Sequence, residues 1–407
     1  MTVLKLLLVL AVIVYGIKRK FFVGYLLCGV GLALPFLFGF GPMDVLKTLY
    51  GTASSFDFWR LFAAIVIVAF LGNLLKTTGS FDRLTDAAQH LAGGKRTAAA
   101  ILPASIGMMP MPAGALLSAP LVREVLKDDN LKPEFLSATN YWYRHVMEFF
   151  WPLYPGIILG AGLCGIPQQT FSALGIVNTL FMISIGIFLF LLKIPNNGNH
   201  STRNIRSIFR IAYSIWPLFL AVVLALVVEL DIVWSLLSAT ILTLIINRPS
   251  WPKVFEMLKK ALTFRLFFMV FGILVFKDML ALSGAVTDMP AEVARLGIHP
   301  AFIIFSVTFL AGLMSGMVAL YVGLCFPILS GFLYDPVVNL NNIYLTYLSG
   351  YLGIILSPTH FCLLLSSEYF KADLGRVYRK FVPGIILLAL FGFLLYWLGY
   401  PWDLLSA

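Results

Sequence analysis

Two stretches rich in glycine and proline decide how this sequence can fold: GMMPMPAGALLSAPLV at residues 107–122 and GLMSGMVALYVGLCFPIL at residues 312–329. Each follows an amphipathic segment, GNLLKTTGSFDRLTDAAQHLAGG at residues 72–94 and KDMLALSGAVTDMPAEVARLG at residues 277–297. The same order therefore occurs twice in the chain. Because glycine and proline interrupt helices, we do not expect either stretch to form one straight helix.

The repeat continues beyond these stretches, since Pro152 of the first half corresponds to Pro358 of the second. We predict two repeats, at residues 1–194 and 211–407, joined by a polar and basic linker at residues 195–210. Each repeat would contain an odd number of membrane spans, so the two would have opposite orientations. Inverted repeats of this kind occur in secondary transporters, whose sites lie near the membrane midplane between the repeats.

The composition is that of a membrane protein. Of the 407 residues, 60% are hydrophobic and 12% are charged, whereas soluble domains carry about 25% charged residues. The sequence therefore predicts an all-α integral membrane protein with about ten transmembrane helices and two re-entrant hairpins, at residues 97–122 and 300–333. The expected spans lie near residues 3–17, 21–40, 59–76, 135–164, 171–193, 211–229, 232–247, 264–282, 342–366 and 381–399. Short interfacial helices are expected at residues 80–94 and 284–297.

The net charge of +10 is distributed between the apolar segments. If both glycine-rich stretches enter and leave on the same side, nearly all lysines and arginines gather on one face. By the positive-inside rule this face is cytoplasmic, so we predict a multi-pass protein of the inner (cytoplasmic) membrane with both termini outside. The opposite face keeps only Lys5, Lys47, Arg60, Lys277 and Arg295. Because the basic residues lie in loops between apolar segments, the net positive charge does not indicate a nucleic-acid partner.

The tips of the two hairpins are the first candidates for binding a solute, because irregular backbone within a bilayer lines a cavity or is buried by protein. Exposed amides and helix N-termini there favour an anion. The alternative is that small residues merely let helices pack closely. The candidate residues are Ser105, Pro110, Pro112 and Gly114 at the first tip and Ser315 and Gly316 at the second.

The fourth expected span carries Asn140, Arg144, His145 and Glu148. Residues 140, 144 and 148 would share one helical face, and a charge near the membrane midplane is a functional candidate. We expect Arg144 and Asn140 to bind an anionic substrate and Glu148 or His145 to handle the coupling ion. The alternative is a structural ion pair between Arg144 and Glu148.

The ninth expected span is interrupted at Ser357-Pro358-Thr359-His360, as the fourth is at residues 151–155. Ser357 and Thr359 are candidates for substrate binding. Histidine changes charge near neutral pH, so His360 is a candidate for proton coupling; the alternative is a buried histidine with satisfied hydrogen bonds.

No pattern in the sequence indicates an enzyme or a metal centre. There is no H-E-x-x-H motif and no nucleophile elbow. His145 and Glu148 resemble part of a metal site, but a third ligand at useful spacing is missing. We therefore predict no metal, no cofactor beyond Na⁺ or H⁺ as a coupling ion, and no catalysis. The four cysteines are interpreted as small buried side chains: Cys28, Cys164, Cys325 and Cys362.

The two interrupted stretches and the two proline-broken spans resemble the ion-transporter superfamily, which includes gluconate, citrate, dicarboxylate and sulfate permeases. Within it, the chain is most similar to domain of unknown function family 401, over nearly its whole length. The resemblance implies a homodimer that takes up small anions with Na⁺ or H⁺. It also implies that the tips at residues 107–114 and 312–316 and the breaks at 151–155 and 357–360 line the site.

One departure concerns the tips. Several members of the superfamily carry Ser-Asn-Thr motifs there that help to bind Na⁺, whereas this chain has MMPMPAG and LMSGMVA. The methionines suit an amphipathic or partly apolar anion.

The leading hypothesis is a secondary active transporter, a symporter of a small organic anion with H⁺ or Na⁺, with elevator-like alternating access. A cation/proton antiporter that uses Glu148 is the alternative, and a membrane-embedded lipid-modifying enzyme or an assembly factor is the alternative of another class.

Overall fold

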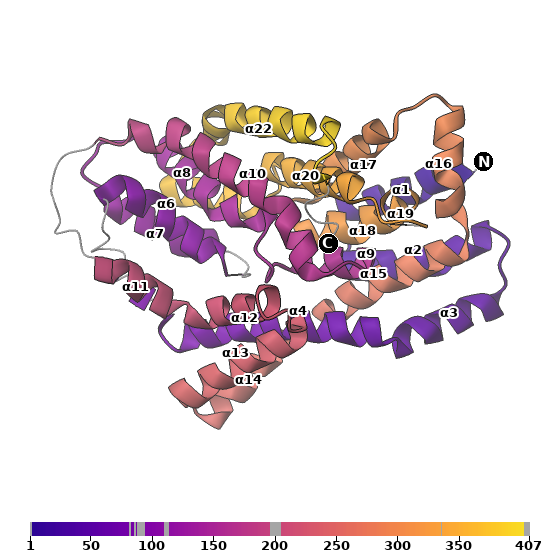
Figure 1. The fold of residues 1–407 in the computed structure, drawn as a ribbon, viewed down its shortest axis with the longest axis horizontal. Coiled ribbons are helices and arrows are strands. Elements are labelled where there is room, and N and C mark those ends of the chain that lie inside the picture. The colour runs from indigo at the N-terminus through magenta and orange to yellow at the C-terminus, as the bar shows by residue number, and fades with distance from the viewer. Residues whose placement is uncertain are drawn as a thin grey trace.

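The structure is a computed structural model. It describes residues 2–80, 83–84, 87, 94–109, 114–195, 205–334 and 336–402. Throughout these residues the regular elements are helices, and no strand occurs among them. Figure 1 shows most of the helices side by side along the long axis of the molecule. The predicted all-α class is confirmed for this part of the chain.

The described part of the first half of the chain consists of α-helices of different lengths and two short 3₁₀ helices, η1 and η2. Its helices are α1 (Thr2–Lys18), α2 (Val23–Leu37), α3 (Pro42–Ser54), α4 (Phe56–Thr77), α6 (Gly94–Gly107), α7 (Gly114–Val125), α8 (Pro133–His145), η1 (Val146–Phe149), α9 (Pro155–Cys164), α10 (Gln168–Leu189) and η2 (Leu191–Lys193).

The second half begins within the predicted linker, most of which lies outside the described residues. Its helices are α11 (Ile205–Ser214), α12 (Trp216–Leu226), α13 (Ile232–Asn247), α14 (Trp251–Ala261), α15 (Phe264–Leu282), α16 (Ala285–Arg295), α17 (Pro300–Ser315), α18 (Val318–Ile328), α19 (Ser330–Leu333), α20 (Leu340–Leu356), α21 (Phe361–Phe370) and α22 (Leu374–Trp397).

Several of these helices are long and apolar enough to cross a membrane. Four segments in the described part of the chain meet that condition alone: α4, α10 with η2, α20 with α21, and α22. A fifth is reached if α14–α15 and α16, which bend by 73°, count as one span. Shorter apolar helices of 10–17 residues, among them α2, α13 and α17, accompany them. The fold is that of a multi-pass membrane protein.

The surface of these helices is suited to lipid. On α13 the exposed side chains include Trp234, Ile241 and Ile245, and on α22 they include Leu390 and Leu394. A soluble monomer rarely exposes apolar patches of this extent. Within a helix, backbone N–H and C=O groups bond to each other, so they do not need the hydrogen-bond partners that the bilayer core lacks.

Both interruptions predicted from proline are confirmed. The first runs from the end of α8 at His145 through η1 to the start of α9 at Pro155, and the second separates α20 from α21 at residues 357–360. The first begins earlier than expected, because α-helical geometry ends before Glu148, which lies in the 3₁₀ turn η1. The expectation that residues 140, 144 and 148 share one continuous α-helix is therefore wrong for Glu148.

Neither glycine-rich stretch forms a single helix. The first gives α6 and α7, with residues 110–113 outside the described part of the chain, and the second gives α17, α18 and the short α19. The two principal helices of each stretch contact each other. The interfacial helix expected at residues 284–297 corresponds to α16, which stands across the long axis in Figure 1. Most of the one expected at residues 80–94 lies outside the described residues.

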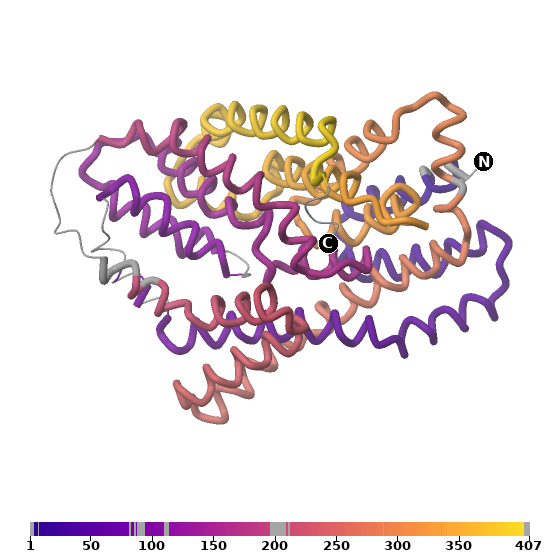
Figure 2. The backbone as a smooth tube through the Cα atoms, in the orientation of Figure 1, coloured from indigo at the N-terminus to yellow at the C-terminus, as the bar shows by residue number. Residues whose placement is uncertain are grey.

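The predicted halves are interleaved in space. Helix α2 packs against α15, α9 against α18, and α8 against both α21 and α22. Figure 2 shows the backbone of the first half passing beside that of the second along the molecule. The interruptions of the two halves therefore come together in the interior, because α8 and α21 are in contact.

Close approach of α2 and α15 depends on glycine. A Cβ atom added at Gly24 would collide with the carbonyl oxygen of Phe268, and one at Gly31 would lie 3.0 Å from the Cα atom of Phe276. Small residues of this kind let helix backbones pack closely inside membranes.

We expect Gly24→Ala to lower the thermal unfolding temperature of the purified protein. Overpacking costs about 1–3 kcal/mol, which exceeds the roughly 1 kcal/mol that alanine gains over glycine in a helix. The matched control is Gly29→Ala on the same helix, where an added Cβ meets nothing within 4 Å. Equal unfolding temperatures for the two variants would contradict this account of the packing.

Candidate active centre at the two helix interruptions

The candidate site lies where the end of α8 meets the start of α21. Proline sets both interruptions: Pro152 and Pro155 lie between η1 and α9, and Pro358 lies between α20 and α21. Proline cannot donate a backbone hydrogen bond, and in a helix interior it kinks or breaks the helix. Glu148 at the first interruption and Ser357 and His360 at the second are buried, whereas Thr359 is exposed.

Arg144 and Glu148 are both buried, with 4% and 8% of their side chains exposed. Arg144 Nη1 lies 3.8 Å from Glu148 Oε1, which is longer than a direct charge-assisted hydrogen bond of about 2.7–2.9 Å. Both side chains also interact with the Tyr154 side chain. The carboxylate atom Glu148 Oε2 has no hydrogen-bond partner among the described residues. The pair is thus close but not tightly joined.

Helices α6 and α7 are pressed against Arg144. A Cβ atom added at Gly107 would collide with the Arg144 carbonyl oxygen, and one at Gly114 would collide with its guanidinium. The Tyr154 hydroxyl donates a hydrogen bond to the Gly107 carbonyl oxygen. The predicted tip residue Gly114 is therefore in direct contact with the predicted anion-binding residue.

His145 and His360 face each other across the two interruptions. Their Nε2 atoms are 3.1 Å apart. His145 Nδ1 lies 2.6 Å from the Tyr141 carbonyl oxygen, and His360 Nδ1 lies 3.1 Å from the Ile354 carbonyl oxygen. Glu148 Oε1 is 3.8 Å from His145 Nε2. The three residues predicted to handle the coupling ion are thus brought together.

Cys362, two residues beyond His360, completes this cluster. Its thiol sulfur and one ring nitrogen of each histidine all lie within 4.8 Å of one another. The cysteine is buried. Sequence reasoning missed it because His145 and His360 belong to different halves of the chain, so no local spacing indicates all three residues together. The two-residue separation of His360 and Cys362 was the one available signal.

Asn140 lies in a separate polar group between α8 and α21. Its side-chain nitrogen donates to the Ser366 hydroxyl at 3.0 Å, and that hydroxyl donates to the Ser137 carbonyl oxygen at 3.2 Å. Asn140 is fully buried. These bonds link the two helices through the Asn140 side-chain nitrogen, whereas its buried Oδ1 has no hydrogen-bond partner among the described residues.

The other predicted site residues occupy different surroundings. Ser357 is buried and Thr359 is exposed, with 2.9 Å between their hydroxyl oxygens. Ser315 accepts a hydrogen bond from the Met317 amide at 3.3 Å and so caps its own turn. Ser105 is buried on α6. Pro110 and Pro112 lie outside the described residues.

Gly316 of the second tip packs against the second interruption. Its φ of +62° is a left-handed conformation, and an added Cβ would lie 3.0 Å from the backbone nitrogen and Cα of His360. The second tip therefore touches the second break, as the first tip touches Arg144 at the first.

Side chains from other helices satisfy the carbonyl groups that the first interruption releases. The donors are two tyrosines of α20 and a threonine of α10, none of which the sequence singled out. The pairs are Tyr351 with the His145 oxygen (2.7 Å), Thr179 with the Val146 oxygen (3.0 Å) and Tyr347 with the Glu148 oxygen (3.0 Å).

The second interruption is satisfied in the same way, and here one donor comes from the first half. Tyr141 on α8 donates to the Ile355 oxygen at 3.0 Å, and Tyr378 on α22 donates to the Leu356 oxygen at 3.1 Å. Each break is thus capped by at least one tyrosine hydroxyl from the opposite half of the chain, with a further hydroxyl from its own half.

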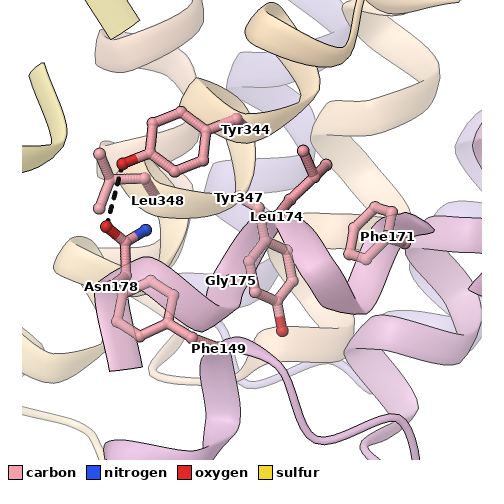
Figure 3. A pocket seen from close by; sticks show the side chains of 8 residues that line it. All are labelled: Phe149, Phe171, Leu174, Gly175, Asn178, Tyr344, Tyr347 and Leu348. Carbon is pink, nitrogen blue, oxygen red and sulfur yellow. Dashed lines mark hydrogen bonds between the residues drawn. The ribbon is translucent and has the colours of Figure 1, made fainter. Parts of the chain in front are cut away.

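A narrow pocket lies beside η1, and Figure 3 shows the side chains that line it. Most are aromatic or aliphatic, and they include Phe149 and Tyr347, which adjoin the Glu148 backbone. Within it, the Tyr344 hydroxyl donates to Asn178 Oδ1 at 2.9 Å. The pocket borders the site but does not contain the charged residues.

A family model described as "Protein of unknown function (DUF401)" matches residues 1–399. The chain belongs to this family. The match covers both interruptions and every residue of the candidate site, which confirms the resemblance to family 401 inferred from the sequence. No curated protein matches the chain.

We expect Tyr351→Phe to lower the unfolding temperature by leaving the His145 carbonyl oxygen without this donor. An unsatisfied buried acceptor costs about 1–3 kcal/mol. Tyr50→Phe is the matched control, because Tyr50 is 76% exposed and its hydroxyl should be dispensable. Thermal unfolding of both variants in the same detergent makes the comparison, and a Tyr351→Phe protein as stable as the control would refute the capping role.

Gly316→Ala should destabilise the protein more than Gly297→Ala. Both glycines have positive φ, +62° and +68°, so both substitutions carry the same backbone strain. An added Cβ meets nothing within 4 Å at Gly297 but presses on His360 at Gly316. We expect an extra cost of about 1–3 kcal/mol at Gly316, measured as the difference in thermal stability. Indistinguishable variants would show that the second tip does not press on the break.

Proposed function

We propose that this protein is a secondary active transporter of a small organic anion, coupled to H⁺ or Na⁺. The observation that carries the proposal is the buried Arg144 guanidinium, which contacts Gly114 at the start of α7 and lies 3.8 Å from Glu148. A buried charge in a membrane protein is costly and is a functional candidate for that reason.

The geometry suits exchange of one anion for another at Arg144. Arginine binds carboxylates through two parallel hydrogen bonds. The 3.8 Å between Arg144 Nη1 and Glu148 Oε1 is too long for such a hydrogen bond. Glycine at position 114 lets the N-terminus of α7 pack against the guanidinium, and helix amides and the helix dipole favour an anion there. A small carboxylate that enters there can take the place of Glu148 as the partner of Arg144.

Coupling to a cation follows from charge balance. When a substrate anion takes over Arg144, the Glu148 carboxylate is left as a second buried anion. A buried charge without a partner costs several kcal/mol, of the order of 3–5 kcal/mol when one member of a pair is lost. A proton or Na⁺ at Glu148 removes that cost, so the anion and the cation are bound together.

The arrangement of the helices supports alternating access. Two broken helices from different halves meet in the interior, and each is touched by a glycine of one of the two stretches. Transporters with inverted repeats bind their solutes at broken helices between the repeats, and this supports the proposal. We propose that the halves are inverted repeats of five spans each, that α6–α7 and α17–α18 are re-entrant hairpins, and that transport is elevator-like.

The remaining expectations extend this proposal. The resemblance to the ion-transporter superfamily supports a homodimer, and the positions of the basic residues support a cytoplasmic membrane with both termini outside. No chemical change of the solute is proposed. Cation/proton exchange is the second candidate, and the observation that favours it is the buried Glu148 Oε2, which has no hydrogen-bond partner in the described part of the chain.

The proposal is tested by thermal stabilisation of the purified full-length protein with a panel of organic anions, with and without Na⁺ and at two pH values. A ligand at one hundred times its Kd stabilises the folded state by about 2.7 kcal/mol. We expect at least one carboxylate to stabilise the wild type, and Arg144→Lys to weaken that effect because an ammonium cannot bind the carboxylate bidentately.

Two further variants guard against simple misfolding. Arg144→Ala combined with Glu148→Gln removes both charges, so no unpaired charge remains, and it should lose the response to anions. Arg60→Ala is the matched control, because Arg60 pairs with Asp231 (Nε to Oδ2, 2.6 Å) away from the site; its response should be unchanged. Anion stabilisation that survives in the double variant would overturn the assignment. Stabilisation by Na⁺ or Li⁺ alone would favour cation/proton exchange at Glu148.

A further inference from the structure

We infer that His145, His360 and Cys362 form a binding site for a thiophilic transition-metal ion of the Zn²⁺ type. The site lies where the two helix interruptions meet, and its ligands come from both halves of the chain. The inference goes beyond anion transport, since it depends on none of the contacts of Arg144. It stands on the positions of one ring nitrogen from each of two buried histidines and the Cys362 sulfur, all within 4.8 Å of one another, with Cys362 9% exposed.

The hydrogen bonds of the two imidazoles decide the chemistry of their facing atoms. Each Nδ1 lies against a backbone carbonyl oxygen, that of Tyr141 for His145 and that of Ile354 for His360. A carbonyl oxygen only accepts, so each Nδ1 must carry the hydrogen and each neutral ring presents an Nε2 lone pair. The two lone pairs face each other at 3.1 Å. Two acceptors in this position repel unless a cation lies between them.

The separation of the two nitrogens suits a tetrahedral metal ion. Zn–N bonds of about 2.0–2.1 Å place two nitrogen ligands roughly 3.3 Å apart, close to the observed 3.1 Å. The backbone carbonyls that hold each Nδ1–H are the partners that fix metal-binding histidines in many proteins. Both rings are therefore already oriented for an ion.

Cys362 supplies the third ligand. Its sulfur receives a hydrogen bond from the backbone of Ala115 at the start of α7, a contact that also suits a metal-bound thiolate. A Zn–S bond of about 2.3 Å requires the sulfur to lie roughly 3.6 Å from each nitrogen, and the sulfur already lies within 4.8 Å of one ring nitrogen of each histidine. On binding, the metal forms a bond to sulfur, and the thiol proton leaves to solvent.

The charges around the site favour a cation. The C-terminal ends of α8 and α20 adjoin the site with the negative ends of their helix dipoles, against the single positive end of α21, whose N-cap is His360. The Glu148 carboxylate lies 3.8 Å from His145 Nε2 and opposes the nearby positive charge of Arg144. Three protein ligands leave a fourth position open, as in zinc sites that bind a further small molecule.

The first test uses the wild-type full-length protein in detergent. After treatment with a chelator and equilibration with Zn²⁺, elemental analysis should find one zinc ion retained per chain, and Mg²⁺ under the same conditions should not be retained. Replacement of Zn²⁺ by Co²⁺ should produce a thiolate-to-cobalt charge-transfer band with tetrahedral ligand-field bands. No retained zinc, or a cobalt spectrum without the thiolate band, overturns the inference.

The second test assigns the ligands. His360→Gln and Cys362→Ser should each raise the Kd for Zn²⁺ at least tenfold, and Cys362→Ser should also remove the charge-transfer band. Cys164→Ser is the matched control, because Cys164 is an equally buried cysteine outside the cluster; its Kd should equal that of the wild type. If zinc binding is unchanged in His360→Gln and Cys362→Ser, the facing nitrogens share a proton instead and the metal site is refuted.

These outcomes are separable from those of the anion test. The Arg144→Lys protein should retain zinc with the wild-type Kd, while Cys362→Ser should lose zinc whether or not it still responds to anions. A protein that binds anions at Arg144 but no zinc refutes the metal site alone, and the reverse result refutes the anion site alone.

Discussion

A backbone carbonyl that is released inside an apolar interior must find a donor, and the centre of this protein is arranged around that requirement. Unsatisfied polar groups in such surroundings cost several kcal/mol. Where α8 and α20 end, the donors are side chains from other helices, chiefly tyrosine hydroxyls. Because Tyr141 serves the second interruption and Tyr351 serves the first, neither half can form its break correctly without the other.

The same requirement fixes the chemistry of the two histidines. Each ring uses Nδ1 to satisfy a carbonyl group near the end of its own interrupted helix. Only Nε2 then remains, and the contact between α8 and α21 brings the two Nε2 atoms face to face. Because both Nδ1 atoms donate to carbonyl groups, the two facing Nε2 atoms each carry a lone pair, and neither has a hydrogen to donate to the other. The arrangement is stable only with a proton or a metal ion, and Cys362 is the reason to prefer the metal.

The sequence predicted the parts of the fold that depend on local patterns. The apolar runs at residues 232–247 and 264–282 coincide with α13 and α15, and proline located both interruptions. Helices α3 and α14 were missed, since each is short and mixes charged with apolar residues. For α3, tertiary contacts supply what the sequence pattern lacks, as in the hydrogen bond of Thr52 to Asp278 (2.6 Å).

The candidate site was predictable only in part for the same physical reason. Arg144, Glu148 and the histidines stand out because charged or titratable side chains are rare within apolar segments. Tyr351 and Cys362 do not stand out, because both are common as ordinary buried residues. Their roles arise from a contact between helices more than two hundred residues apart in the chain, as the separations of Tyr351 from His145 and of His360 from His145 illustrate. No local period or spacing encodes such a contact.

Arg144 and His145 are adjacent at the end of α8, but they face different helices and favour ligands of opposite charge. Successive side chains on a helix point about 100° apart, so Arg144 meets α6 and α7 while His145 meets the start of α21. An anion is favoured on one side of the helix end and a cation on the other. The hydroxyl caps join α8, α20 and the interruptions through several hydrogen bonds, whereas α6 and α7 approach Arg144 through glycines. In the proposed cycle the two interruptions would therefore move as one body. A solute that enters between Arg144 and the glycines of α6 and α7 would break fewer hydrogen bonds than one that separates the capped helices.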